Sequence, residues 1–346
     1  MIQGALFGAG NIAQRGHLQA LDSDPALSSE MRITSCCDLA PANLEAVRSR
    51  WPAIRTYGSA GALWAAEKPD FVDICTPPDS HAALIREAAS RNCHIFCEKP
   101  LCRSSAEAGE LDAVLRDRPL VFLPGHQYHH APPWRAVADA VRAGDIGELR
   151  FVEWTVWRKE ANPGSAAWAP TWRTDPRVGG GGILMDHGAH VVYQLRSLLG
   201  DPLAVTALMQ KLRPDPYPVE DTATVVFEYS RAVARLGFTW ASPLREITNR
   251  LVGTRGEIRV SDDRIVLARG GEEQELKFGA GMSANSSHSE WFVPLFREFV
   301  ARVKRRDHAR DAWEEAVASL RTLEACYRSS AEGRTIRLPA TEKATA

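Results

Sequence analysis

The sequence predicts an α/β fold: an N-terminal Rossmann domain with a parallel sheet, followed by an α+β domain with a large, mostly antiparallel open sheet. Short apolar runs alternate with helical patterns over residues 1–123, as in βαβ units. From residue 149 onward, longer alternating runs joined by short turns are typical of antiparallel strands. The 346 residues exceed the ~250–300 that one core holds, so we predict two domains, 1–123 and 124–346.

The predicted elements of the first domain follow one another regularly. Strands are expected at residues 2–7, 32–37, 71–75, 94–97 and 120–123. Apolar residues at helical spacing predict helices at residues 12–21, 43–50, 60–67, 80–90 and 106–116. Prolines at positions 124, 132 and 133 then mark a change of character, and a helix over 134–143 ends at Gly144, as at a glycine C-cap.

The second domain is predicted to consist mainly of strands. Period-two alternation places them at residues 149–158, 203–211, 222–229, 232–240, 246–252, 257–260 and 264–268. One helix, over 183–199, interrupts this series, and two more, over 291–303 and 312–327, close the chain.

Composition excludes several function classes. Hydrophobic residues make up 45% and charged residues 25%, which is typical of an ordinary globular protein. The net charge of -1 argues against nucleic acid or acidic lipid as a partner. No run approaches the ~18 apolar residues of a spanning helix and no signal-peptide pattern is present, so we expect a cytoplasmic protein without a membrane partner. The seven cysteines, mostly in apolar strand-like contexts, are expected to be reduced core residues.

A glycine motif follows the first predicted strand. Gly8-Ala9-Gly10-Asn11-Ile12-Ala13 reads G-x-G-x-x-A and opens a predicted helix, the context that makes this motif meaningful. Gly8 permits the tight turn and Gly10 lets the backbone approach a pyrophosphate. At Asn11 and Ile12 the helix N-terminus presents unsatisfied N–H groups to the phosphates. We therefore predict a dinucleotide site at residues 8–13.

Asp38 follows the second predicted strand. A carboxylate there can accept both ribose hydroxyls of NAD and would repel the 2′-phosphate of NADP. Its distance from the glycines exceeds the usual ~20 residues, and an inserted loop at residues 22–30 would account for this. No Arg immediately follows Asp38 to bind a phosphate, so we predict NAD rather than NADP. The alternative is a solvated acid at a strand end.

Three further motifs extend the pattern over nearly the whole chain. They are Thr76-Pro77-Pro78-Asp79-Ser80-His81, Cys97-Glu98-Lys99-Pro100-Leu101, and the run from Gly180 to His190. Together with the glycine motif they resemble the Gfo/Idh/MocA family. The resemblance implies a two-domain NAD(P)-dependent oxidoreductase acting on sugars, cyclitols or their derivatives. It also implies a homodimer or homotetramer that associates through the open C-terminal sheet.

The resemblance implies that Lys99, Asp186 and His190 are the catalytic residues. Oxidising a secondary alcohol needs a base for the hydroxyl proton and a group that stabilises developing charge. Asp186 and His190 are four apart on a predicted helix and so share one face. Imidazole exchanges protons near neutrality, and the helix dipole favours the Asp186 carboxylate by ~0.3–1 kcal/mol. Lys99 follows the carboxyl end of a parallel strand, the edge where ligands bind.

The motifs also extend the predicted cofactor site. Beside Lys99, we expect Thr76, Pro77, His81 and Glu98 to line the NAD site. Pro100 fixes the turn that aims the lysine, and the bond before it is a candidate for the cis form.

The predicted substrate site departs from the family pattern. Many members carry an Arg-containing segment after the strand at 120–123, whereas this chain has Gly125-His126-Gln127-Tyr128-His129-His130. Residues 168–173 are a second expected lining, in which aromatic faces can stack on a sugar ring and Arg173 can bind hydroxyls, a carboxylate or a phosphate. The residues predicted to contact substrate are His126, Tyr128, Arg158, Trp172, Arg173 and His187.

The leading hypothesis is an NAD-dependent oxidoreductase that moves a hydride between nicotinamide and a secondary alcohol or ketone of a sugar, cyclitol or related polyol derivative. One alternative is a redox-neutral enzyme, since the family includes glycosidases that retain NAD. A second is a non-catalytic NAD-dependent sensor. We predict no metal site, because His187 and His190 lack an evident third ligand and the cysteines near His94 lack zinc-site spacing.

Overall fold

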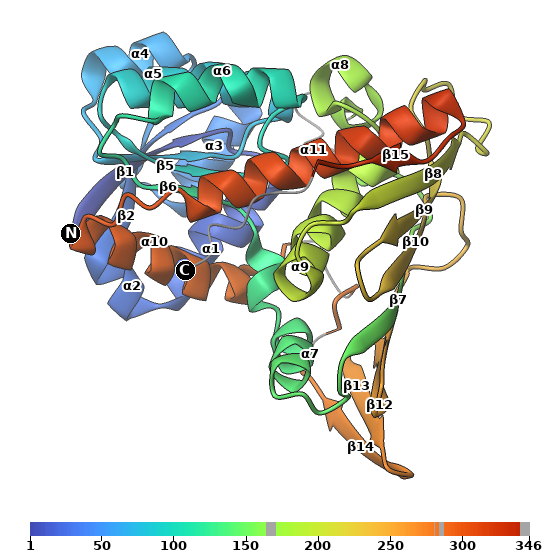
Figure 1. Cartoon of the computed structure of the whole chain (residues 1–346). Helices are drawn as coiled ribbons and strands as arrows, with labels where there is room; N and C mark the ends of the chain where they lie inside the picture. The colour runs from blue at the N-terminus through green and yellow to red at the C-terminus, as the bar shows by residue number, and fades with distance from the viewer. Residues whose placement is uncertain (164–170, 280, 284–286, 340–346) are drawn as a thin grey trace. The chain divides into compact units, whose positions relative to one another are not determined.

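The computed structural model describes residues 1–163, 171–279, 281–283 and 287–339. The chain forms two compact units, whose segments can be followed by residue number in Figure 1. Unit 1 comprises Met1–His130, Asn162–Gly180 and Ser286–Ala318, and unit 2 comprises Ala131–Ala161, Gly181–Asn285 and Ser319–Ala346. The division into domains at 1–123 and 124–346 stays a prediction.

A parallel sheet forms the centre of unit 1. Among the described residues it has six strands in the order β3-β2-β1-β4-β5-β6, with every neighbouring pair parallel. The order reverses between β1 and β4, the topological switch point at which such sheets bind ligands. The strands are β1 (Ile2–Phe7), β2 (Met31–Cys37), β3 (Arg55–Tyr57), β4 (Phe71–Ile74), β5 (His94–Cys97) and β6 (Phe122–Pro124).

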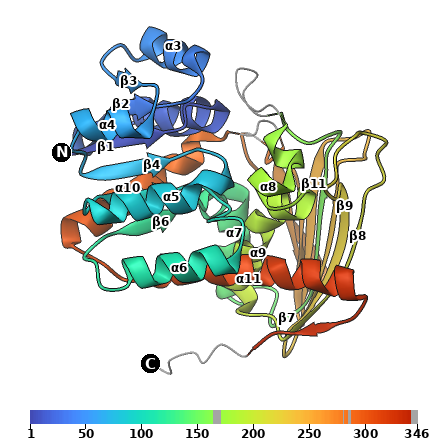
Figure 2. The same cartoon turned by 90° about the horizontal axis from the view of Figure 1, so that it is seen from above.

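Helices cover both faces of this sheet. Figures 1 and 2 show α5 (Pro78–Ser90) and α6 (Ser105–Leu115) on one face, and α1 (Gln19–Ser23), α2 (Pro25–Glu30) and α10 (Ser289–Arg305) on the other. The remaining helical segments of unit 1 are η1 (Ala13–Leu18), α3 (Pro41–Arg50), α4 (Ala60–Ala66), η2 (Gln127–His130), η3 (Trp172–Thr174), α8 (Pro176–Gly179) and the start of α11 (Asp311–Glu332).

Helix α10 joins unit 1 although it lies far along the chain. Its side chains Phe292, Phe296 and Phe299 are fully buried and share one core with Phe71 and Phe96 of the sheet. This burial of aromatic surface explains why the segment packs here.

Unit 2 is built on a mostly antiparallel sheet. In the described part of the chain it has nine strands in the order β14-β13-β12-β11-β7-β10-β9-β8-β15, of which only β7 and β10 pair in parallel. The strands are β7 (Leu149–Trp157), β8 (Ala204–Gln210), β9 (Thr222–Glu228), β10 (Val233–Thr239), β11 (Glu246–Gly253), β12 (Gly256–Ser261), β13 (Arg264–Arg269), β14 (Glu272–Lys277) and β15 (Ile336–Arg337). The helical segments are α7 (Pro132–Arg142), η4 (Leu184–Gly188), α9 (Ala189–Leu199) and the rest of α11.

The predicted fold class is confirmed, and several elements differ locally from the prediction. The predicted inserted loop at 22–30 is wrong, because residues 25–30 form helix α2, whose first N–H groups are capped by Asp24. Strand β3 was missed because it has only three residues. Strand β14 was missed because all its residues are exposed and it shows no apolar alternation.

No described helix is long and apolar enough to cross a membrane. All seven cysteines are buried, as expected of core residues.

Candidate active site

The carboxyl edge of the parallel sheet gathers most of the predicted cofactor residues. Asp38 follows β2, residues 8–12 follow β1, Thr76 and Pro77 follow β4, and Glu98 and Lys99 follow β5. These four strands are neighbours in the order β2-β1-β4-β5, so the loops after them lie along one edge. The edge includes the switch point between β1 and β4, where a dinucleotide would lie.

The geometry of the glycine loop fits a bound diphosphate. Gly8 has φ +88°, and a Cβ there would lie 2.7 Å from the backbone nitrogen of Thr76, so the close approach of the loops after β1 and β4 requires glycine. A Cβ at Gly10 would meet nothing within 4 Å, which leaves open space on that side of the loop. The helix that follows begins as the π-helical turn η1 and continues as α1, instead of the one regular helix predicted over 12–21.

Asp38 contacts the glycine loop directly. Its Oδ2 accepts the backbone N–H of Ala9 at 2.6 Å and its Oδ1 accepts that of Ala40 at 2.7 Å. The half-buried carboxylate is therefore held beside the loop, where a ribose acid belongs.

His81 connects two of these loops. Its Nε2 lies 2.7 Å from the carbonyl oxygen of Thr76, and its Nδ1 lies 3.1 Å from that of Pro100. The ring is fully buried between the loops after β4 and β5, and burial lowers its pKa. The neutral ring has one N–H, which it donates to one of these carbonyl groups. The Lys99–Pro100 bond is cis, as expected from the sequence.

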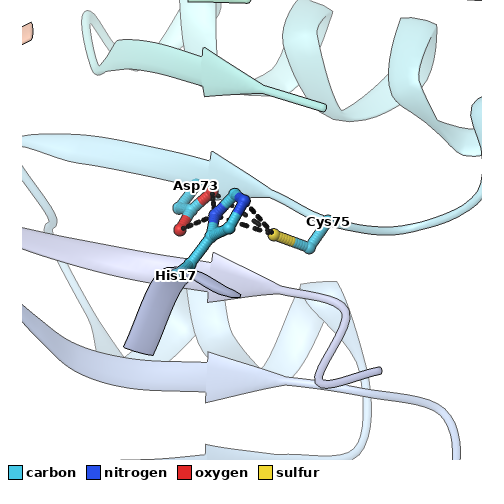
Figure 3. A group of neighbouring side chains, drawn as sticks. All are labelled: His17, Asp73 and Cys75. Carbon is cyan, nitrogen blue, oxygen red and sulfur yellow. Dashed lines mark hydrogen bonds and ion pairs between the residues drawn. The ribbon is translucent and has the colours of Figure 1, made fainter. Parts of the chain in front are cut away.

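A buried polar cluster that the sequence analysis missed lies beneath this edge. We call it the His17 network, formed by His17, Asp73, Cys75 and Glu98. In Figure 3 the His17 ring lies between Asp73 and Cys75, which are two residues apart and so face the same side of the strand. His17 Nδ1 is 2.9 Å from Asp73 Oδ2, and His17 Nε2 is 3.1 Å from Glu98 Oε1. His17 and Asp73 are completely buried.

The network holds its histidine protonated. Burial alone would lower the pKa of His17, but the charge and hydrogen bond of Asp73, followed by those of Glu98, raise it to about 9. Burial raises the pKa of Glu98, yet the hydrogen bond and charge of His17 bring it below its ordinary value. We therefore expect an imidazolium at neutral pH, which can donate from both nitrogens.

Two groups of described side chains could hold a metal by proximity of donor atoms: His17 with Asp73 and Cys75, and His126 with His129 and Glu315. In the first, Nδ1 is 2.9–3.0 Å from both Asp73 oxygens and Nε2 faces Glu98, which is the pattern of two N–H donors. In the second, each imidazole contacts a different oxygen of Glu315, at 2.8 and 3.2 Å. In both groups the distances fit hydrogen bonds in which histidine N–H groups donate to carboxylate oxygens.

Asp186, His187 and His190 lie in unit 2, where a π-helical turn, η4, leads into α9. The predicted helix over 183–199 is present, but its first turn is not α-helical as expected; such π-turns are frequent at functional sites. His187 Nδ1 is 3.3 Å from Asp186 Oδ2. His190 is buried, and its Nδ1 lies 3.0 Å from the hydroxyl of Tyr193, which orients the ring.

Glu220, which no sequence motif marks, fixes the start of this helix. Its carboxylate accepts the backbone N–H groups of Gly182 and Leu184 at 3.0 and 3.1 Å and the hydroxyl of Tyr327 at 2.7 Å. A Cβ at residue 182 would collide with the carbonyl oxygen of Glu220, so only glycine allows this close approach. Burial raises the pKa of Glu220 despite these donors.

The predicted substrate residues after β6 meet a partner from a distant helix. Glu315 on α11 contacts Nδ1 of His126 and Nε2 of His129. Burial lowers the pKa of His126. Burial also raises the pKa of Glu315, but its hydrogen bonds to His126 and His129 lower that pKa more. The Glu315 carboxyl group is therefore ionised. Tyr128 packs edge-on against Trp291, with ring centroids 5.0 Å apart. Nothing in the sequence links residue 315 to these histidines.

The other predicted substrate residues are divided between the units. In unit 1, the Arg173 guanidinium lies 4.2 Å from the centre of the Trp172 ring. Residues 168–170 of the same predicted lining lie outside the described residues. In unit 2, Arg158 is buried and its Nη1 donates to the carbonyl oxygens of Trp157 and Glu246 at 2.8 and 3.1 Å.

The three predicted catalytic residues are divided between the units as well. Lys99 belongs to unit 1, whereas Asp186 and His190 belong to unit 2, so their joint action stays a prediction.

Comparison with known proteins agrees with this geometry. Residues 2–126 match the model of an oxidoreductase family with an NAD-binding Rossmann fold, and residues 134–259 match the GFO/IDH/MocA C-terminal domain. Together the two matches cover most of the chain.

Similar proteins include several dehydrogenases. The D-apiose dehydrogenase of Rhizobium rhizogenes is 24% identical over 320 residues, which cover 89% of this chain and 90% of the relative. The inositol 2-dehydrogenase of Rhizobium meliloti is 27% identical over 353 residues, which cover 96% and 98% of the two chains. The structure of a levoglucosan dehydrogenase with NADH and levoglucosan is similar with a TM-score of 0.85 at 19% identity, covering 98% of this chain and 99% of that one.

The protonation of His17 predicts a pH-dependent stability. Because folding raises the pKa of His17 from 6.5 to about 9, its contribution is complete below pH 6.5 and is lost as the pH rises through about 9. The loss should total roughly 3 kcal/mol of unfolding free energy. Urea unfolding across this range, compared with His17→Gln, isolates the contribution. A difference between the two proteins that does not change with pH would contradict the assignment.

Glu220 predicts a second effect on stability. Glu220→Ala leaves two backbone N–H groups and the Tyr327 hydroxyl without their acceptor, so the unfolding free energy should fall by about 1–3 kcal/mol. Turnover should fall as well, because the turn that carries Asp186 loosens. The exposed control Glu228→Ala should change stability by less than about 0.5 kcal/mol. Equal stability of both variants would refute a role for Glu220 at this helix start.

Proposed function

The chain belongs to the Gfo/Idh/MocA oxidoreductase family, and on this premise we propose that it is an NAD-dependent dehydrogenase or reductase of a sugar, cyclitol or related polyol derivative. The observation that carries the proposal is the carboxyl edge of the parallel sheet. It combines a glycine loop open at Gly10, a carboxylate of Asp38 that accepts a hydrogen bond from that loop, and a lysine two residues beyond the end of β5. A binding protein would need the first two features, but the lysine adds a proton donor and positive charge at the same edge.

The proposed cofactor residues divide by task. Residues 8–12 hold the diphosphate, Asp38 holds the adenosine ribose, and the loops after β4 and β5, with Thr76, Pro77, His81, Glu98 and Lys99, line the nicotinamide half. When bound, NAD supplies the hydride acceptor. We propose NAD over NADP because the Asp38 carboxylate would repel a 2′-phosphate.

The catalytic proposal assigns one task to each of three residues. His190 takes the proton of the substrate hydroxyl through Nε2, because Tyr193 engages Nδ1. Asp186 orients the same hydroxyl, and the ammonium of Lys99 stabilises the negative charge that develops on the oxygen. In the reductive direction His190 returns the proton.

The proposed substrate residues favour a hydroxylated ring. Tyr128 and Trp172 offer aromatic faces for the C–H side of such a ring, and His126, His187, Arg158 and Arg173 offer hydrogen bonds to hydroxyls or an acidic group. The ionised Glu315, which contacts His126 and His129, adds a hydrogen-bond acceptor beside the segment that follows β6. The cytoplasmic location expected from the sequence stays a prediction.

The substrate screen is the direct test of this proposal. Purified protein with NAD is assayed for NADH formation against sugars, inositols, amino-cyclitols and sugar acids. We expect turnover with at least one compound, and a loss of about 10²–10⁴-fold in His190→Ala and Lys99→Ala while the dissociation constant for NAD changes little. The same substrate with NADP should react much more slowly.

Other outcomes of the screen separate the alternatives. Comparable rates with NAD and NADP would contradict the role of Asp38. Tightly retained NAD with substrate cleavage but no NADH release would indicate the redox-neutral glycosidase. Retained NAD with no conversion of any compound would favour the sensor.

We also propose a homodimer or homotetramer formed through the sheet of unit 2. Phe151, Trp157, Val226 and Val233 lie on one face of β7, β9 and β10, each 37–38% exposed. Light scattering should give the mass of a dimer or tetramer, and Phe151→Glu with Trp157→Glu should reduce it. The control Leu39→Glu changes an exposed loop residue of unit 1 and should leave the mass unchanged. A monomeric wild type would contradict the proposal.

A further inference from the structure

The His17 network contains two buried groups that the proposed reaction does not use, His17 and Asp73. Its other carboxylate, Glu98, adjoins the lysine that the reaction needs most. Glu98 immediately precedes Lys99, and its Oε2 accepts the backbone N–H of Lys99 at 3.1 Å. Its other oxygen, Oε1, lies 3.1 Å from Nε2 of His17 on η1. One carboxylate thus contacts both the helix that follows the glycine loop and the turn that carries the lysine.

The position of Glu98 is tightly confined. A Cβ at Gly125, directly after β6, would lie 2.8 Å from Glu98 Oε1, so the glycine leaves just enough room for the carboxylate. On the other side of the ring, Asp73 holds Nδ1 through both oxygens, at 2.9 and 3.0 Å. Phe292 and Phe296 pack against the His17 ring, with centroids 4.3 and 5.3 Å from it. Neither the ring nor the carboxylate can move without breaking several contacts.

We propose that His17 is a positioning residue for Lys99: its imidazolium holds the Glu98 carboxylate, and that carboxylate fixes the backbone turn from which the lysine projects. The inference rests on the proposed catalytic role of Lys99. A neutral imidazole has one N–H and could serve only one of the two carboxylates, so both contacts require the protonated ring. The ring therefore links the start of the cofactor-binding helix to the catalytic lysine.

Loss of the Nε2 contact has a specific consequence. The Glu98 carboxylate would be buried without its charged partner, which is costly, and it would rotate or bind a proton. Lys99 would then lose the acceptor of its backbone N–H, and the turn would relax. Misplacement of a reacting group by ~1 Å can cost ~10²-fold in rate.

Two neutral substitutions of one side chain separate positioning from general stability. The amide of His17→Asn takes the place of Nδ1, so it can still reach Asp73 but not Glu98. The amide of His17→Gln takes the place of Nε2, so it can reach Glu98 but not Asp73. Both variants lose the charge and keep one hydrogen bond, so their melting temperatures and NAD dissociation constants should be similar. We expect kcat to fall about 100-fold in His17→Asn and only about tenfold in His17→Gln.

A double variant tests whether the effect passes through Glu98. Glu98→Ala removes the acceptor of the Lys99 N–H, so it should lower kcat about as much as His17→Asn. Adding His17→Asn to Glu98→Ala should then lower kcat little further, because the two substitutions break the same link. Independent, multiplying losses in kcat would overturn the proposal.

Hydrogen exchange at the Lys99 amide gives a readout that needs no turnover. By NMR, this amide should be protected in the wild type and in His17→Gln, and should exchange faster in His17→Asn. Equal exchange and equal kcat in the two His17 variants would show that His17 is merely structural. A wild-type kcat in Lys99→Ala would instead refute the proposed function, whatever the exchange result for His17.

Discussion

The buried contact of His17 with two carboxylates is the interaction on which the carboxyl edge of the parallel sheet depends. Removing His17, Asp73 and Glu98 from water is expensive, and only close pairing with full hydrogen bonding offsets that cost. Such a group has few alternative arrangements, because any shift leaves a charge without its partner. The network therefore fixes three elements relative to one another: the helix after the glycine loop, strand β4, and the turn that follows β5.

In each unit a carboxylate accepts backbone N–H groups next to residues proposed for catalysis. In unit 1, a buried carboxylate accepts the backbone N–H of the residue that begins the lysine turn. In unit 2, Glu220 accepts two backbone N–H groups at the start of the helix that carries Asp186 and His190. In both places a glycine, at 125 or 182, leaves room for the acid to approach the backbone. In both units a carboxylate thus fixes the backbone next to a residue proposed for catalysis.

The sequence predicted what local patterns encode. Period-two and helical spacing predicted the fold class, and the glycine motif with Asp38 predicted a cofactor site at the carboxyl edge of the parallel sheet, because strand order follows from βαβ connections. It could not reveal β14, whose residues are all exposed, or the π-helical turns, which have no distinctive spacing. The partners Asp73, Glu220 and Glu315 were missed for another reason: each meets its histidine or helix through the tertiary fold, 36 to 189 residues away along the chain. An isolated acid in a sequence resembles any solvated surface acid.

The measurement that tests the central claim most directly is the protonation state of His17, read from the nitrogen shifts of its ring by NMR with His17→Gln to assign the signal. The account predicts that both ring nitrogens carry protons at neutral pH and that the ring titrates near pH 9. A ring with one unprotonated nitrogen at neutral pH would contradict it, because such a ring cannot donate to Asp73 and Glu98 together.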